Sequence, residues 1–243
     1  PNPVLIELPP PSDLVVDAIT VPPNGTTGAE VTIAFTVRNK TGATAEGSWT
    51  DSVYLSADSE WGLNDILLGK VTHNGNLAVG ASYSSQLLAT LPPAKAGAYR
   101  IIVRSDIFNQ VYEGVDERNN STASADALTL TVPTLQLGVP LSTTLSPGEQ
   151  RLFKVTVGAN ETLSVALDGA DDLSANELFV RYGDVASGFA FDFGAQQVLS
   201  SDPSTLVPST QAGDYYVLIQ GRSGANNSPV KLTAKALPFS ITD

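Results

Sequence analysis

Residues 30–39 read EVTIAFTVRN, a segment in which apolar side chains alternate with polar or small ones. The apolar positions are Val31, Ile33, Phe35 and Val37. Successive side chains of a β-strand point to opposite faces of the sheet, so this alternation predicts a strand with one buried face. The segment therefore favours a β-sheet protein.

Similar short runs, separated by turn-forming residues, lie on both sides of this segment. They read DLVVDAIT (13–20), SWTDSVYLS (48–56), ILLGKVTH (66–73), YSSQLLATL (83–91), AYRIIVRS (98–105) and LTLTV (128–132). About seven strands with turn signals between them are typical of an immunoglobulin-like sandwich. We predict one such domain over residues 13–132.

The strand pattern starts again after Pro133 and Thr134, where we place the domain boundary. The later runs read LQLGVPLSTTL (135–145), RLFKVTVG (151–158), TLSVALDG (162–169), ELFVRYG (177–183), DYYVLIQG (214–221) and VKLTAKAL (230–237). The run at 214–221 is apolar on both faces, as expected of a central strand. We predict a second antiparallel sandwich over residues 135–237, and hence an all-β chain of two tandem β-sandwiches.

The two ends of the chain read differently from these strands. Residues 1–12 include the run PPP, which favours a stiff extended linker because proline fixes φ and lacks an amide donor. Residues 238–243 resemble the start of another linker or module. The chain holds no methionine, so residue 1 is not a translation start, and we expect the interior of a longer polypeptide.

Composition excludes several classes of function. The chain has 13 Lys and Arg against 25 Asp and Glu, a net charge of −12, which argues against a nucleic-acid partner. It has no cysteine, which excludes a disulfide scaffold and a thiolate metal site. No apolar run reaches the roughly 18 residues of a membrane span, so we expect no membrane insertion by this chain.

Calcium is the main chemical candidate. The loop at residues 58–65 offers oxygen side chains from Asp58, Glu60, Asn64 and Asp65. Calcium takes about 6–8 oxygen ligands from such groups, although the spacing here is not that of an EF-hand. The alternative is a solvated acidic hairpin loop. We expect this loop to lie at the opposite end of the sandwich from the turn after Asp106, so the two should not share one ion.

Aromatic residues offer a second candidate, a sugar-binding platform. The residues concerned are Trp49, Tyr54, Trp61, Tyr83, Tyr182, Phe189, Phe191 and Phe193. The run GFAFDFG at 188–194 predicts a strand with one aromatic face, which core packing would explain equally well. Trp61 stands inside a polar loop, so we take it as the best exposed anchor for a ligand.

Catalytic constellations are missing from the sequence. His73 is the single histidine, and no nucleophile context of the G-x-S-x-G type accompanies it. Asp171 and Asp172 lie in a predicted turn, where Asx-type hydrogen bonds explain them better than glycosidase chemistry does. We therefore expect no enzyme.

The first half resembles the CARDB family, a bacterial adhesion-related immunoglobulin-like domain. The matching segments are DLVV, TIAFTVRN, YLSADSEWGLNDILLG, LPPAKAGAYRIIVRSD and VYEGVDERNN, which together span about residues 13–132. The second half resembles the bacterial pre-peptidase C-terminal (PPC) domain, a jelly-roll-like sandwich, through LSPGEQRLFKVTV, ETLSVALDG, ELFVRYG and AGDYYVLIQG. Glu177 stands where that family usually has Asp, which puts any family ion site there in doubt.

Both resemblances imply modules of a large extracellular or cell-surface bacterial protein. We expect non-catalytic adhesion or spacer domains with Ca²⁺ as the candidate stabilising ion, whose partners are other domains of the same polypeptide and extracellular polysaccharide or protein. The alternative is an accessory module that holds a secreted hydrolase or peptidase near its polymeric substrate.

Overall fold

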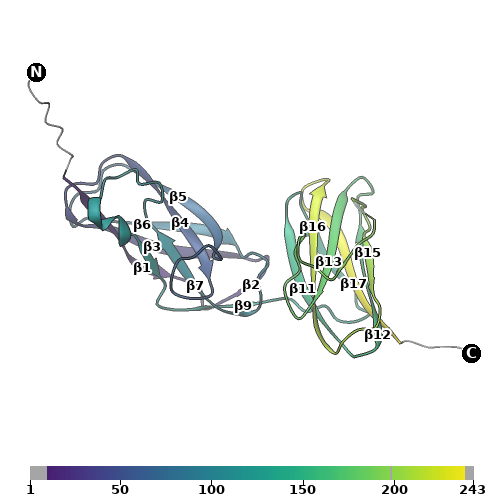
Figure 1. Ribbon diagram of the computed structural model, residues 1–243. Helices are drawn as coiled ribbons and strands as arrows, with labels where there is room; N and C mark the ends of the chain where they lie inside the picture. The colour runs from purple at the N-terminus through teal and green to yellow at the C-terminus, as the bar shows by residue number, and fades with distance from the viewer. Residues whose placement is uncertain (1–9, 198, 239–243) are drawn as a thin grey trace, which may run out of the picture. The chain divides into compact units, whose positions relative to one another are not determined.

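The computed structural model describes residues 10–197 and 199–238, which divide into two compact units after Leu130 (Figure 1). The segments Thr26–Gly28 and Pro92–Ala96 group with the second unit. Most of the two expected linkers, at 1–9 and 239–243, lies outside the described residues. Ser12, which we placed in the first linker, belongs to the first strand instead.

The first unit is a sandwich of two antiparallel sheets. One sheet has the order β1 (Ser12–Thr20), β3 (Glu30–Gly42), β6 (Ser82–Thr90). The other has the order β2 (Asn24–Thr26), β9 (Leu128–Thr131), β7 (Gly97–Arg104), β4 (Ser48–Ser56), β5 (Ile66–Asn74), with β8 (Ser121–Ala123) also paired to β7. A 3₁₀ helix, η1 (Gly114–Arg118), precedes β8.

The alternation predicted for β3 is confirmed. Ile33, Phe35 and Val37 are buried, and Trp49 and Val53 of β4 are fully buried in the facing sheet. Each such apolar side chain contributes about 1.5–3 kcal/mol through burial. Two antiparallel sheets with this inward alternation form the immunoglobulin-like arrangement that the sequence predicts.

The free edge of β1 is closed by the segment that follows β7. The amide of Ser12 donates to the carbonyl of Tyr112 at 3.1 Å, the amide of Leu14 donates to Oε1 of Glu113, and the hydroxyl of Thr122 donates to the carbonyl of Val16 at 3.0 Å. These three partners alternate along β1, as edge-facing groups of a strand do. The contacts satisfy an edge that would otherwise pair with another chain.

Glu113 is the centre of this closure. Its side chain is fully buried, and Oε2 accepts a hydrogen bond from Nδ2 of Asn120. Burial raises the pKa of Glu113 from 4.5 to about 7, and the nearby carboxylates of Glu117 and Asp106 act in the same direction, while the two hydrogen bonds oppose them. Its carboxyl group is therefore half-protonated in the folded protein near neutral pH.

The second unit is also a sandwich, of two four-stranded sheets. One has the order β10 (Leu141–Leu145), β17 (Ser228–Pro238), β12 (Glu161–Gly169), β15 (Ser204–Val207). The other has the order β11 (Gln150–Val157), β16 (Gly213–Ser223), β13 (Ala175–Tyr182), β14 (Phe193–Gly194). Eight strands divided in this way form a jelly-roll-like sandwich, and β16 is central, as predicted.

The sheet that contains β16 packs on both of its faces. Val217 and Ile219 point into the main core, whereas Tyr216 and Leu218 join a smaller outer cluster with Ala186. The outer cluster exists because the segment after β13 folds back over the outward face of its own sheet. This explains why the run at 214–221 is apolar on both faces.

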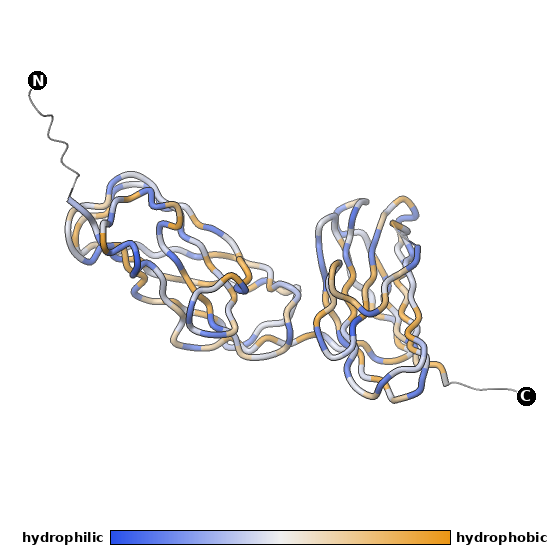
Figure 2. Tube along the Cα trace, in the orientation of Figure 1, coloured by the Kyte–Doolittle hydropathy of each residue, from blue (hydrophilic) through white to orange (hydrophobic). Residues whose placement is uncertain are grey.

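Hydropathy follows the layers in both units. In Figure 2 hydrophobic residues recur along the strands, and hydrophilic residues are frequent in the connecting loops. Among the described residues, no helix has the length and apolar character needed to cross a membrane.

The first prediction concerns the pH dependence of the first unit. The pKa of Glu113 is about 7 in the folded state, whereas the ordinary value for glutamate, as in the unfolded chain, is 4.5. The proton that the folded state binds more tightly therefore stabilises the fold fully below about pH 4.5. This contribution, up to about 3 kcal/mol, is lost as the pH rises through 7. Glu113→Gln stays neutral and should not show this loss.

Urea unfolding between pH 4.5 and 8, followed by tryptophan fluorescence, measures the difference. Both tryptophans, Trp49 and Trp61, lie in the first unit, so the signal reports that unit. Glu30→Gln, at an exposed acid at the start of β3, is the control and should retain the wild-type pH dependence. Parallel pH profiles of the wild type and Glu113→Gln would contradict the assignment.

Candidate functional site

The predicted calcium loop connects β4 to β5, and its carboxylates are partly occupied by the loop itself. Oδ1 of Asp58 accepts the amide of Glu60 at 2.8 Å, and Oδ2 of Asp65 accepts the amide of Gly62 at 2.8 Å. The bond of Asp58 is a short Asx-type turn, whereas that of Asp65 reaches back to the amide three residues before it, and both shape the hairpin end. Each aspartate keeps its second carboxylate oxygen for solvent or a cation.

The described residues contain no group of three or more His, Asp or Glu side chains arranged to hold a metal ion. Residues 58–65 therefore do not bring their acidic side chains together. The site formed by Asp58, Glu60, Asn64 and Asp65 stays a prediction.

Trp61 lies in the same loop, and 41% of its surface is exposed. The guanidinium of Arg104 lies 3.9 Å from the centroid of its ring, and Tyr54 meets it edge-on at 6.2 Å. Trp61 also lines a shallow groove of about 470 Å³ with Glu117 and Asn120. One face of the indole is thus occupied, and its role as a ligand anchor stays a prediction.

The turn after Asp106 lies at the opposite end of β4 from the loop at 58–65, as predicted, because the amide of Ile107 donates to the carbonyl of Thr50 near the start of β4. The later residues Glu117 and Asn120 nevertheless line the same groove as Trp61, since Trp61 folds back onto Arg104 of β7.

The aromatic residues of β4, β5 and β6 are not a platform for a ligand. Trp49 is fully buried, and its indole N–H donates to the hydroxyl of Tyr83 at 2.9 Å. That hydroxyl donates to Oδ2 of Asp51 at 2.5 Å, and burial raises the pKa of both Tyr83 and Asp51. The chain of bonds links β6 to β4 across the sandwich, so these groups serve the fold.

His73 belongs to the same cluster. Its ring stacks on Tyr83 at 4.0 Å and lies 4.2 Å from Trp49, and burial lowers its pKa. Nε2 of His73 lies 3.1 Å from the carbonyl of Gly75. The imidazole therefore packs as an aromatic ring and bonds to its own turn.

The turn predicted at Asp171 is confirmed. Oδ1 of Asp171 accepts the amide of Leu173 at 3.0 Å, which is an Asx turn.

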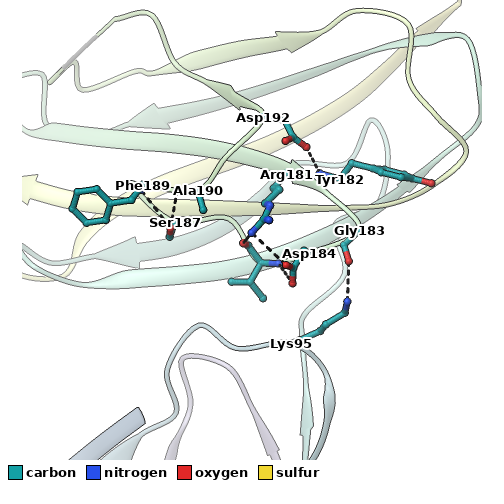
Figure 3. A network of polar contacts seen from close by, with 10 residues as sticks. Lys95, Arg181, Tyr182, Gly183, Asp184, Ser187, Phe189, Ala190 and Asp192 are labelled. Atoms are coloured by element: carbon teal, nitrogen blue, oxygen red, sulfur yellow. Dashed lines mark hydrogen bonds and ion pairs between the residues drawn. The ribbon is translucent and has the colours of Figure 1, made fainter. Parts of the chain in front are cut away.

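The run at 188–194 is not a strand with an aromatic face, contrary to the sequence prediction. Phe189 is fully exposed, Phe191 is 43% exposed, and only Phe193 packs against the main core, from the two-residue strand β14. The physical reason is local hydrogen bonding, which favours a loop over an extended strand. The hydroxyl of Ser187 accepts the amide of Ala190 at 3.0 Å (Figure 3).

Further contacts tie this loop to β13. Oδ2 of Asp192 accepts the amide of Tyr182 at 2.8 Å, and Arg181 pairs with Asp184 at 3.3 Å (Figure 3). The loop is consequently held at both of its ends against the strand that it leaves.

Beside this loop, the outward face of the sheet forms a groove of about 610 Å³. Its floor includes Gln150, Gln220 and Glu177, which are cross-strand partners in register on β11, β16 and β13. Phe179 and Phe191, with ring centroids 4.9 Å apart, form its aromatic wall.

Sequence reasoning missed most of this groove. Gln150, Gln220 and Glu177 stand on strands that are neighbours in the sheet but lie far apart in the chain. The only signal in the sequence was the polar position on the outward face of each strand. That signal is shared by any solvated sheet, so it did not single out these residues.

Comparison with known proteins gives a match for the first unit. Residues 11–124 match the CARDB family. No curated protein matches the chain.

Two solved structures are among those to which the chain is similar. A CARDB domain from Pyrococcus furiosus, in complex with di-metal ions, is 22% identical, with a TM-score of 0.37, over 49% of this chain and 89% of that one. The secreted serine protease VesC from Vibrio cholerae is 10% identical, with a TM-score of 0.32, over 92% of this chain and 52% of its own.

The first sandwich, with its buried Glu113 and the paired asparagines that follow η1, is thus the part of the chain that is similar to the CARDB family, over residues 11–124.

Proposed function

We propose that the chain is a pair of non-catalytic β-sandwich modules that act in adhesion or as spacers within a large exported or surface-attached bacterial protein. One observation carries this proposal. The carboxyl groups with raised pKa in the described part of the chain, those of Asp51, Asp106 and Glu113, all serve the fold.

Asp106 shows this use most clearly. Its side chain is buried, Oδ1 accepts the amide of Gln110 at 2.8 Å, and Oδ2 accepts the amide of Val111 at 2.7 Å. A general acid or base needs a proton site that a substrate can reach. Both oxygens of Asp106 are spent on closing a loop, and those of Asp51 and Glu113 are spent in the same way.

A second candidate function is an accessory module of a secreted hydrolase or peptidase. The groove of the second unit favours it, because a concave site with aromatic and amide side chains suits the binding of a polymer. The resemblance of residues 135–236 to PPC domains supports the same reading. In both candidates the partners are other domains of the same polypeptide and extracellular polysaccharide or protein.

The proposal predicts that the isolated chain does not turn over polymers. Incubation with casein and with neutral polysaccharides should release no amines or reducing ends above a heat-denatured sample, because among the described residues the carboxyl groups with raised pKa are engaged in hydrogen bonds within the fold. Product that increases with the concentration of native chain would contradict the proposal.

We further propose that Ca²⁺ binds the loop at residues 58–65. Asp58 and Asp65 each retain one carboxylate oxygen beyond their turn bonds, and Glu60 and Asn64 are exposed beside them. An exposed loop of this kind fits the weak millimolar affinity of extracellular calcium modules.

Calcium at 5–10 times its Kd should stabilise the first unit by about 1 kcal/mol, through binding to the native state alone. Differential scanning fluorimetry with and without millimolar Ca²⁺ measures the shift in Tm. The double variant Asp58→Asn, Asp65→Asn is the matched control, because asparagine oxygens can still accept the two amides. An unchanged wild-type Tm, or an equal shift in both proteins, would remove calcium from the proposal.

Trp61 is proposed as an exposed anchor for a partner. Trp61→Ala should cost only about 0.5–1 kcal/mol in unfolding free energy, the contribution of an exposed cation–π contact. Trp49→Ala, at the fully buried indole, should cost about 3–5 kcal/mol. If urea unfolding gives the two variants similar losses, Trp61 is a core residue and the anchor is wrong.

A further inference from the structure

The outward face of the sheet β11–β16–β13 is only half covered by its own loop. Leu218 and Tyr216 pack under Val185 and Ala186 in the outer cluster. Further along the same strands the face opens into the groove of about 610 Å³, a volume in the range of small-molecule sites. The open half of this sheet face carries a different set of side chains.

The floor of the groove is rich in planar polar groups. Nε2 of Gln150 donates to Oε1 of Gln220 at 3.1 Å. This bond uses one donor of the first amide and one acceptor position of the second, so both amides retain further donors and acceptors. They therefore present hydrogen-bonding groups of both kinds to a ligand in the groove.

The charges of the groove cancel. Glu177 and Arg222 line it, and Oε2 of Glu177 accepts Nε of Arg222 at 2.8 Å and lies 2.7 Å from Nη2. No other lining residue of the groove is an acid or a base. A neutral groove on a chain with a net charge of −12 favours an uncharged ligand over an ionic one.

The wall of the groove is aromatic and held in place. Phe191 rests on the backbone of β14, where an added Cβ at Gly194 would lie 3.0 Å from its ring. Phe189 stands fully exposed at the rim, on the turn closed by the hydroxyl of Ser187 (Figure 3). A large apolar ring held out in water marks an interaction site when it borders a groove.

We propose that this groove binds one or a few neutral sugar units of a polysaccharide. The C–H face of a pyranose stacks on an aromatic ring, while its hydroxyl groups, each donor and acceptor, match the amides of Gln150 and Gln220. An extended peptide pairs mainly with a strand edge. The polar groups here come from side chains on a sheet face, which favours a carbohydrate.

This inference rests on the proposed function, because it names the class of ligand that the second module takes. The test is affinity electrophoresis of the whole chain in native gels that contain galactomannan, a soluble β-glucan or arabinoxylan. We expect at least one neutral polysaccharide to retard the chain, equally in low salt and in 0.5 M NaCl, because no charge pairing drives the contact.

Two variants place the binding in the groove. Phe189→Ala, at a fully exposed side chain, and Gln220→Ala should each raise the Kd obtained from the retardation about tenfold. This change corresponds to one lost stacking or hydrogen-bonding contact. Phe108→Ala is the matched control, an exposed phenylalanine of the first unit, and should bind as the wild type does. Equal Tm values for Phe189→Ala and the wild type show that the fold is intact.

Absence of retardation by all three neutral polysaccharides would overturn the inference, as would retardation that Phe189→Ala leaves unchanged. Retention by polygalacturonate or gelatin instead would replace the ligand class with an anionic glycan or a protein. Release of reducing ends in the same gels is a separate outcome. It would contradict the non-catalytic function while leaving the groove as the binding site.

Discussion

The buried carboxyl group of Glu113 closes the first sandwich. It accepts the amide of Leu14 from one sheet and the side chain of Asn120 beside the other. An edge strand must satisfy its outward amides, and β1 does so through this side chain and its neighbours along the loop. In the sequence, the acidic segment after β7 resembles a ligand site. In the structure, Glu113 of this segment holds the first strand in place.

In the second unit, a loop covers part of one face of a sheet. Its sheet β11–β16–β13 is apolar on both sides near Tyr216 and Leu218, and the loop after β13 folds back to bury that outer patch. The loop does not cover the whole face, and Gln150, Gln220 and Glu177 remain in the open groove. Structural cover and binding surface thus come from one segment, since the loop that buries the patch also presents Phe189 and Phe191.

The two units differ in where their polar and aromatic side chains lie. In the first unit the buried carboxyl groups of Asp51, Asp106 and Glu113 are engaged within the fold, and the loop at 58–65, which includes Trp61, is exposed. In the jelly-roll-like unit the polar and aromatic side chains meet in a concave face. Among the described residues, the carboxyl groups with raised pKa are all engaged in hydrogen bonds within the fold, and this supports the proposal of non-catalytic modules.

The sequence by itself determined the two all-β units, because the alternation at 30–39 has the period of two that strands have and the short run at 214–221 is apolar on both faces, as in a central strand. It also determined the short turn at Asp171, whose bond is local. Tertiary structure alone decided the groove and the role of Glu113. Gln150 and Glu177 both pair with Gln220 only because β16 lies between β11 and β13, which depends on strand order. The burial of Glu113 depends on the amide of Leu14, which is distant in the sequence. Local hydrogen bonds of Ser187 and Asp192 turned the Phe-rich run at 188–194 into a loop, against its period-two pattern, because the turn bonds were available there and a paired strand was not required.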